Sequence, residues 1–101
     1  MTSITMHVTN NYGESVRVEV INYDVQTTDD ITVDNNDTQS LKIIKDVYGI
    51  AHTRELEVIV YKIGEDTPKE QRTVQLGKMG KNEVVNIIIT KGNTSPVILV
   101  E

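Results

Sequence analysis

The amino-acid sequence predicts an all-β domain, an antiparallel β-sandwich of about eight strands that takes in residues 1–101 as one unit. The composition is the first observation behind this prediction: 14 Val, 12 Ile and 12 Thr stand against 4 Leu and one Ala. β-Branched side chains pack well on a pleated sheet, whereas Ala and Leu favour helices. The second observation is spacing, because short segments of period-two alternation are separated by turn-forming residues and no segment has a helical period.

The first part of the chain is predicted to hold three strands. Residues 3–10 and 15–23 alternate between Val, Ile or Met on one face and mostly polar residues on the other. Between them, residues 11–14 include a glycine, which can adopt a positive φ, and are predicted to form a short hairpin loop. Residues 25–30 are polar and are predicted to be a loop, followed by a short strand at 31–33.

The middle of the chain is predicted to hold two more strands. Residues 34–37 are all turn formers, and residues 39–45 form the next strand. Residues 46–53 are irregular and are predicted to cross from one sheet to the other. Residues 54–63 alternate cleanly, and a polar loop at 64–71 follows them.

The last part of the chain contains the most apolar strands. Residues 72–76 are predicted to be a strand, and the glycine-containing segment 77–82 to be a hairpin loop. Residues 83–90 and 96–101, joined by a turn, are apolar on both faces, and such strands need cover on both sides. Immunoglobulin-like, C2-like and jelly-roll topologies all stay open at this point.

Composition and charge exclude several classes of protein. The chain has no Cys, which excludes a disulfide scaffold and thiolate chemistry, and its net charge of −5 disfavours nucleic-acid binding. No apolar run approaches the length of a membrane span, and the first residues do not have the pattern of a signal peptide. The compartment in which the chain works stays open.

No catalytic residues are predicted, and the chain is expected not to be an enzyme. The only histidines are His7, on the polar face of a strand, and His52, in the irregular segment, and neither has a serine motif beside it. Glu55 and Glu57 share one strand face, where charged residues commonly discourage edge pairing.

The favoured function is a structural or protein-interaction module that forms a homo-oligomer or binds a protein partner. Two features suggest the contact: an outer patch of large side chains, and an apolar last strand that could accept a further strand. Acidic loops at 24–37 also stand against Lys69, Arg72, Lys78 and Lys81, a charge separation that favours head-to-tail contacts. The possible interface residues are Ile21, Tyr23, Ile59, Tyr61, Val97 and Leu99.

The alternative is a ligand-binding module that is calcium-dependent or binds carbohydrate. Five carboxylates fall within fourteen residues without a base among them, and loops at one end of a sandwich can hold calcium, as C2 domains do. The spaced Asp-x-Asp pattern of those domains is missing here, and no other cofactor is expected. Tyr12, next to a glycine in a loop, is the candidate for stacking on a ligand. The possible calcium ligands are Asp24, Asp29, Asp30, Asp34 and Asp37.

Overall fold

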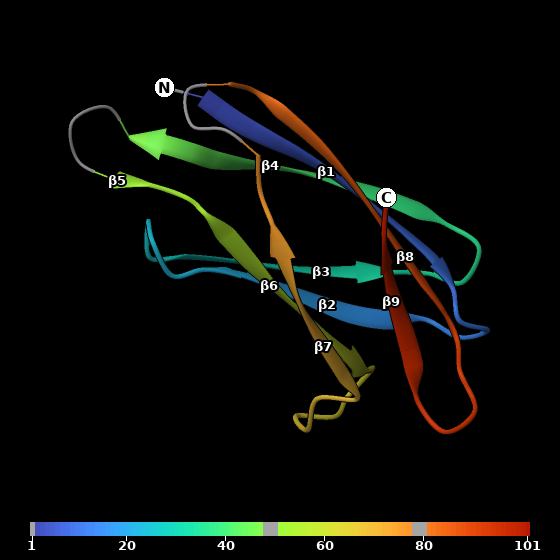
Figure 1. Cartoon of the computed structure of the whole chain (residues 1–101). Coiled ribbons are helices and arrows are strands. Elements are labelled where there is room, and N and C mark those ends of the chain that lie inside the picture. Colours follow the sequence, from blue (N-terminus) through green and yellow to red (C-terminus); the bar gives the residue numbers. More distant parts are fainter. Residues whose placement is uncertain (1, 48–50, 78–80) are drawn as a thin grey trace.

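The computed structural model describes residues 2–47, 51–77 and 81–101, which form nine strands in two facing sheets (Figure 1). This arrangement confirms the predicted all-β sandwich, with one more strand than expected. No helix in the described part of the chain is long and apolar enough to cross a membrane. The five-stranded sheet, in the order β5-β4-β1-β8-β9, consists of β1 (Thr2–Asn11), β4 (Thr38–Val47), β5 (Ala51–His52), β8 (Glu83–Lys91) and β9 (Pro96–Val100). The four-stranded sheet, in the order β3-β2-β6-β7, consists of β2 (Val16–Asn22), β3 (Thr27–Val33), β6 (Glu55–Lys62) and β7 (Glu70–Gln75).

The alternation read from the sequence places the core side chains as predicted. In β1, Ile4, Met6 and Val8 are fully buried, and the residues between them are only half-buried. Burying one such side chain contributes roughly 1.5–3 kcal/mol to the free energy of folding. A single cluster of buried side chains from both sheets therefore holds the two sheets together. That cluster comprises Ile4, Met6, Val8, Val16, Val18, Val20, Val33, Ile43, Leu56, Val58, Val60, Val74, Val85, Ile87, Ile89 and Ile98.

The strand connections differ from the prediction in two ways. Residues 11–14 do not close a hairpin, because β1 and β2 lie in different sheets, although Gly13 does adopt a positive φ of 111°. The connection at 77–82 likewise joins the two sheets; residues 78–80 lie outside the described part. As a result β1 and β8 are parallel neighbours, so the five-stranded sheet is mixed and not purely antiparallel.

Two predicted loops contain strand residues. Residues 27–30 belong to β3, which pairs with β2 through a tight turn in which Gln26 has a φ of 58°. They are polar because β3 is an edge strand, and an edge strand tolerates polar residues on both faces. Residues 70–71 similarly begin β7. The segment 46–53 first returns as β5, which pairs with β4, and only then crosses to the other sheet.

Two buried asparagines close the ends of the sandwich. Asn10, at the end of β1, donates from Nδ2 to the carbonyls of Glu14 (2.8 Å) and Val33 (2.9 Å). Asn22, at the end of β2, donates from Nδ2 to the Ile44 carbonyl (3.2 Å) and to Thr53 Oγ1 (2.8 Å). Each side chain therefore joins one sheet to the other. The two ends are called the Asn10 end and the Asn22 end below.

Candidate functional site

An apolar strip lies on the outer face of the five-stranded sheet at β8 and β9. The strand register pairs Ile88 with Leu99 and Thr90 with Val97, so these side chains are neighbours on that face, and Val84 lies further along β8. Val84 is 62% exposed, Leu99 40% and Val97 39%. The four residues Val84, Ile88, Val97 and Leu99 are called the β8–β9 strip below. Cover was expected on both faces of these strands, but in the single chain only the inner face is covered.

Most of the rest of this outer face carries polar side chains, and Ile44 of β4, 39% exposed, is an apolar exception. His7 Nδ1 lies 2.7 Å from Ser40 Oγ, and Thr9 Oγ1 lies 2.9 Å from Thr38 Oγ1, in two adjacent cross-strand pairs between β1 and β4. Thr5 and Lys42 form the next pair along. Apart from Lys42 these side chains are short, so another surface could approach this part of the face closely.

Ile21, Tyr23, Ile59 and Tyr61 share the outer face of the four-stranded sheet, but they do not form one exposed patch. Ile59 is only 6% exposed and Tyr61 8%, whereas Tyr23 is 65% exposed. The Arg17 guanidinium lies 3.9 Å from the centre of the Tyr61 ring, and Tyr61 Oη donates to Glu19 (3.1 Å). Burial, together with this hydrogen bond, raises the pKa of Tyr61 above its ordinary value. Long neighbouring side chains therefore cover the part of this face that was predicted to be open.

The five aspartates proposed as calcium ligands are spread over both ends of the sandwich and the strand between them. Asp24 lies at the Asn22 end and accepts from the Arg54 backbone N–H (3.0 Å). Asp29 and Asp30 lie within β3, and Asp30 forms an ion pair with Arg17 (2.8 Å). Asp34 and Asp37 lie at the Asn10 end, where Asp34 accepts from Ser15 Oγ (3.0 Å). Among the described residues, no three His, Asp or Glu side chains are grouped so as to hold a metal ion.

Tyr12 does not project freely from its loop. It is half-buried against the core, and its backbone N–H donates to Asn10 Oδ1 (2.8 Å). A shallow, open depression of about 460 Å³ lies nearby at the Asn10 end, and Tyr12 is not among its lining residues. The depression is lined by Glu14, Ser15, Lys62, Ile63 and Glu65.

In the structure, the acidic and basic side chains are not separated onto opposite ends of the sandwich. Lys69 follows β6 at the Asn10 end, the same end as Asp34 and Asp37, and forms an ion pair with Glu65 (3.0 Å). Lys81 lies at the other end with Asp24, and Lys78 lies outside the described residues. The charge separation suggested by the sequence therefore does not carry over to the fold.

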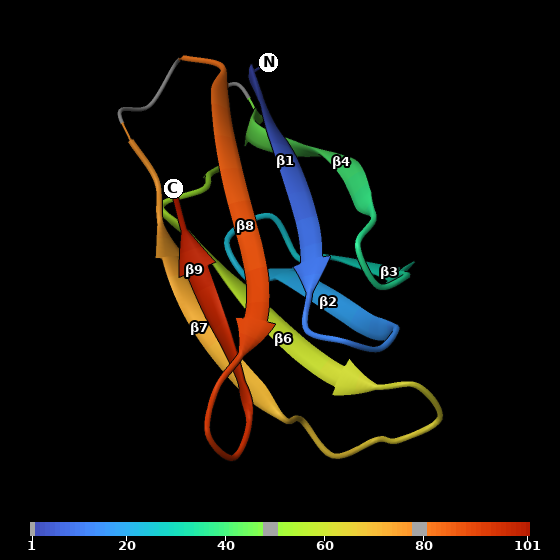
Figure 2. The same cartoon turned by 90° about the vertical axis from the view of Figure 1, so that its right-hand side faces the viewer.

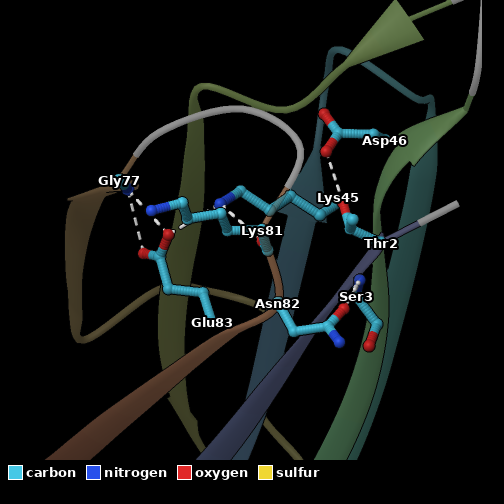
Figure 3. Close-up of polar contacts among 8 residues, drawn as sticks. All are labelled: Thr2, Ser3, Lys45, Asp46, Gly77, Lys81, Asn82 and Glu83. Atoms are coloured by element: carbon cyan, nitrogen blue, oxygen red, sulfur yellow. Dashed lines mark hydrogen bonds and ion pairs between the residues drawn. The ribbon is translucent and has the colours of Figure 1, made fainter.

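A buried lysine at the Asn22 end was not predicted from the sequence. Lys45 is fully buried, and its Nζ donates to Glu83 Oε1 (2.7 Å) and to the Lys81 carbonyl (3.0 Å) (Figure 3). The Glu83 carboxylate also accepts from the Gly77 N–H, at 2.8 and 2.9 Å. One usable signal was present, because continuing the alternation of Leu41 and Ile43 by one step puts Lys45 on the inner face.

A bulge and an ion pair explain this position. Thr2 pairs with Asp46 and Ser3 with Ile44, so Lys45 is the extra residue on β4. Burial of Glu83 acts to raise the pKa of its carboxyl, but the hydrogen bonds from Lys45 and Gly77 and the charge of Lys45 outweigh it, and the pKa falls below its ordinary value. The cluster therefore fastens the start of β8 to β4, which is a structural role.

No protein-family model matches the chain, and comparison with curated proteins and with solved structures found no significant match. The function is therefore argued from the geometry of the residues above.

Proposed function

We propose that this chain is a non-enzymatic structural module that associates with a second copy of itself through the outer face of its five-stranded sheet. The observation that carries this proposal is the β8–β9 strip. Of the six exposed large apolar side chains in the described residues, three belong to the strip. Exposed apolar side chains gathered in this way, although Asn86 lies between Val84 and Ile88, are typical of a contact surface.

The strip is too small to act alone. A stable interface buries about 800 Å² on each partner, out of 5943 Å² of surface for this chain. The half of the face formed by β1 and β4, which is polar apart from Ile44, supplies the remaining area, because two outer faces can stack like the sheets of a sandwich. The same face carries an exposed lysine, Lys42, on β4 and an exposed glutamate, Glu101, directly after β9. A two-fold contact would pair opposite charges twice.

Stacking of faces is favoured over the addition of a strand to β9. Arg72 of β7 donates to the Ile98 carbonyl (2.7 Å), so the middle of the β9 edge is already occupied. Pro96, at the start of β9, has no N–H to offer. The edge strand predicted to accept a partner strand is thus protected, and its apolar outer side chains are what remains available.

Catalysis has little support in the geometry. The contact between His7 and Ser40 resembles half of a nucleophile–base pair, but it lies on an open, flat face. Within the described residues no carboxylate contacts His7 to orient its ring, as a catalytic triad would require. His52, the other histidine, accepts a hydrogen bond from Arg54 Nε (3.2 Å) at the Asn22 end.

The test is the mass in solution, measured by light scattering after gel filtration at two protein and two salt concentrations. A mass of at least twice 11.3 kDa that persists in high salt supports an apolar face contact. The double variant Val97→Thr/Leu99→Thr keeps strand-forming residues and should shift the mass towards the monomer. Ile63→Thr, at a position 52% exposed in the β6–β7 loop, is the matched control and should leave the mass unchanged. A monomer in all four conditions, or an oligomer untouched by the double variant, overturns the proposal.

A monomeric result would move attention to the ligand-binding alternative. Thermal melts with and without calcium then decide it, because a ligand present at a hundred times its dissociation constant adds about 2.7 kcal/mol of stability. An unchanged melting temperature would exclude a calcium site of useful affinity.

A further inference from the structure

The two flanks of the sandwich, where the edges of the two sheets meet, are built differently. On one flank β7 and β9 lie side by side (Figure 2). Arg72 of β7 joins them through its hydrogen bond to the Ile98 carbonyl. On the other flank lie β3 and β4, which are joined by no backbone ladder. Ile31 of β3 and Leu41 of β4 reach this second flank and are only partly buried against the core.

Both strands of the second flank have an open edge. β3 is the outermost strand of its sheet. β5 covers β4 only at Asp46 and Val47, so residues 38–44 pair with β1 alone among the described strands. The Asn10 N–H bonds to the Asp37 carbonyl, and backbone groups alternate in direction along an antiparallel strand. The N–H and C=O groups of Ser40 and Lys42 therefore point outward.

The two open edges carry opposite charges. Residues 27–33 contain Asp29 and Asp30 and no base, although Asp30 is also ion-paired with Arg17 of β2, whereas residues 38–44 contain Lys42 and no acid. Like edges brought together would repel, and charged edge residues commonly prevent such pairing. The acidic edge of one copy and the basic edge of another would attract.

The strand directions allow both contacts at once. β1 is antiparallel to β4, β2 is antiparallel to β3, and β1 and β2 run towards opposite ends of the sandwich, so β3 and β4 run in opposite directions. A two-fold axis along the strands would set β4 of one copy antiparallel to β3 of the other, and the symmetry repeats the contact. The outer face of β4 would continue into the outer face of β3, so that Lys42 and Asp30 would lie on one continuous face within reach of each other.

We infer that a second copy of this chain pairs with this flank, β4 against β3 in both directions, with reciprocal contacts between Lys42 and Asp30. The pairing would satisfy the open backbone groups of both edges and cover Ile31 and Leu41. It uses the edge of β4 and not the β8–β9 strip, but it shares Lys42 with the face contact proposed above. Asp30→Lys and the mixture of variants are therefore the measurements that report on the flank contact alone. A chain with both contacts would form extended assemblies, because each copy would present two separate surfaces.

Charge exchange tests the inference. Lys42→Glu and Asp30→Lys should each raise the dissociation constant of the flank contact about tenfold or more, since each places like charges together twice. An equimolar mixture of the two variants should return the dissociation constant to that of the natural chain, because both reciprocal contacts of the mixed pair again join opposite charges. Sedimentation velocity on the full-length chains measures this, and circular dichroism verifies that each variant is folded. Lys91→Glu, on the exposed end of β8, is the matched control and should leave association unchanged.

The outcomes separate this inference from the proposed function. If association recovers in the mixture of Lys42→Glu and Asp30→Lys, the flank contact is established, whether or not Val97→Thr/Leu99→Thr also weakens association. Association that only the latter variant weakens supports the face contact and overturns the flank contact. Single variants that associate as the natural chain does, or a mixture that does not recover, also overturn it.

Discussion

Replacing Glu83 by glutamine tests whether the buried ion pair at the Asn22 end holds the fold together. Lys45 Nζ is fully buried and lies 2.7 Å from the Glu83 carboxylate, which is itself 25% exposed. Glu83→Gln keeps the shape of the side chain and removes its charge. The ammonium of Lys45 then stays buried with a weaker partner.

The expected loss follows from this burial. Breaking a fully buried ion pair costs about 3–5 kcal/mol, because the remaining charge is left uncompensated. Glu83 is partly reached by water, and Lys45 keeps its bond to the Lys81 carbonyl, so we expect a smaller loss of about 2–3 kcal/mol. For a chain of this size that corresponds to a melting temperature lower by roughly 10–20 °C.

Urea denaturation followed by circular dichroism measures the change in the free energy of unfolding. Glu65→Gln is the control, because the ion pair between Lys69 and Glu65 has a similar length, 3.0 Å, but is exposed on both sides. Its loss should be no more than about 0.5 kcal/mol. If Glu83→Gln costs no more than this control, the ion pair does not fasten β8 to β4 and the reasoning fails.

The same pair predicts a pH dependence. The pKa of Glu83 is lowered in the folded chain from its ordinary value of 4.5. The carboxylate therefore stabilises the fold fully above that pH, and this contribution is lost as the pH falls below 4.5 through the folded-state value. The difference in stability between the natural chain and Glu83→Gln should shrink over that range, and a constant difference would contradict the assignment.

Three further changes test the packing and the edges. Ile87→Ala empties a fully buried position in β8 and should cost about 2–5 kcal/mol in urea denaturation. Asn10→Ala leaves two carbonyls of other segments without their donor and should cost about 1–3 kcal/mol by the same measurement. Arg72→Met frees the Ile98 carbonyl at the edge of β9, so light scattering should show faster aggregation at raised protein concentration. Unchanged aggregation would mean that Arg72 does not protect this edge.

The elements that the sequence predicted well are those whose burial follows a local rule. In β1 and β2 every second side chain enters the core, so the pattern of Ile4, Met6 and Val8 already shows which face is buried. β3 was half missed for the opposite reason: as an edge strand it carries Thr and Asp where a central strand carries Val, and polar strand residues resemble loop residues.

The candidate site depended less on local pattern. Val97 and Leu99 were predicted as possible interface residues of an apolar last strand, and both are exposed on β9. The burial of Tyr61 could not be predicted, because its ring contacts Arg17 and its hydroxyl contacts Glu19, both on a strand far away in the sequence. The five aspartates seemed close together only along the chain, since a strand separates Asp24 from Asp34 in space.

The sequence by itself determined the all-β class, the inner faces of the regular strands and the apolar character of the last two, because these follow from the composition and from period-two alternation within single segments. The tertiary structure alone decided that β1 lies parallel to β8, that Lys45 is buried beside Glu83, and that the β3 and β4 edges share an open flank. These features arise where distant segments meet. The chain changes sheet between strands, and only the packing of the two sheets fixes which residues then become neighbours.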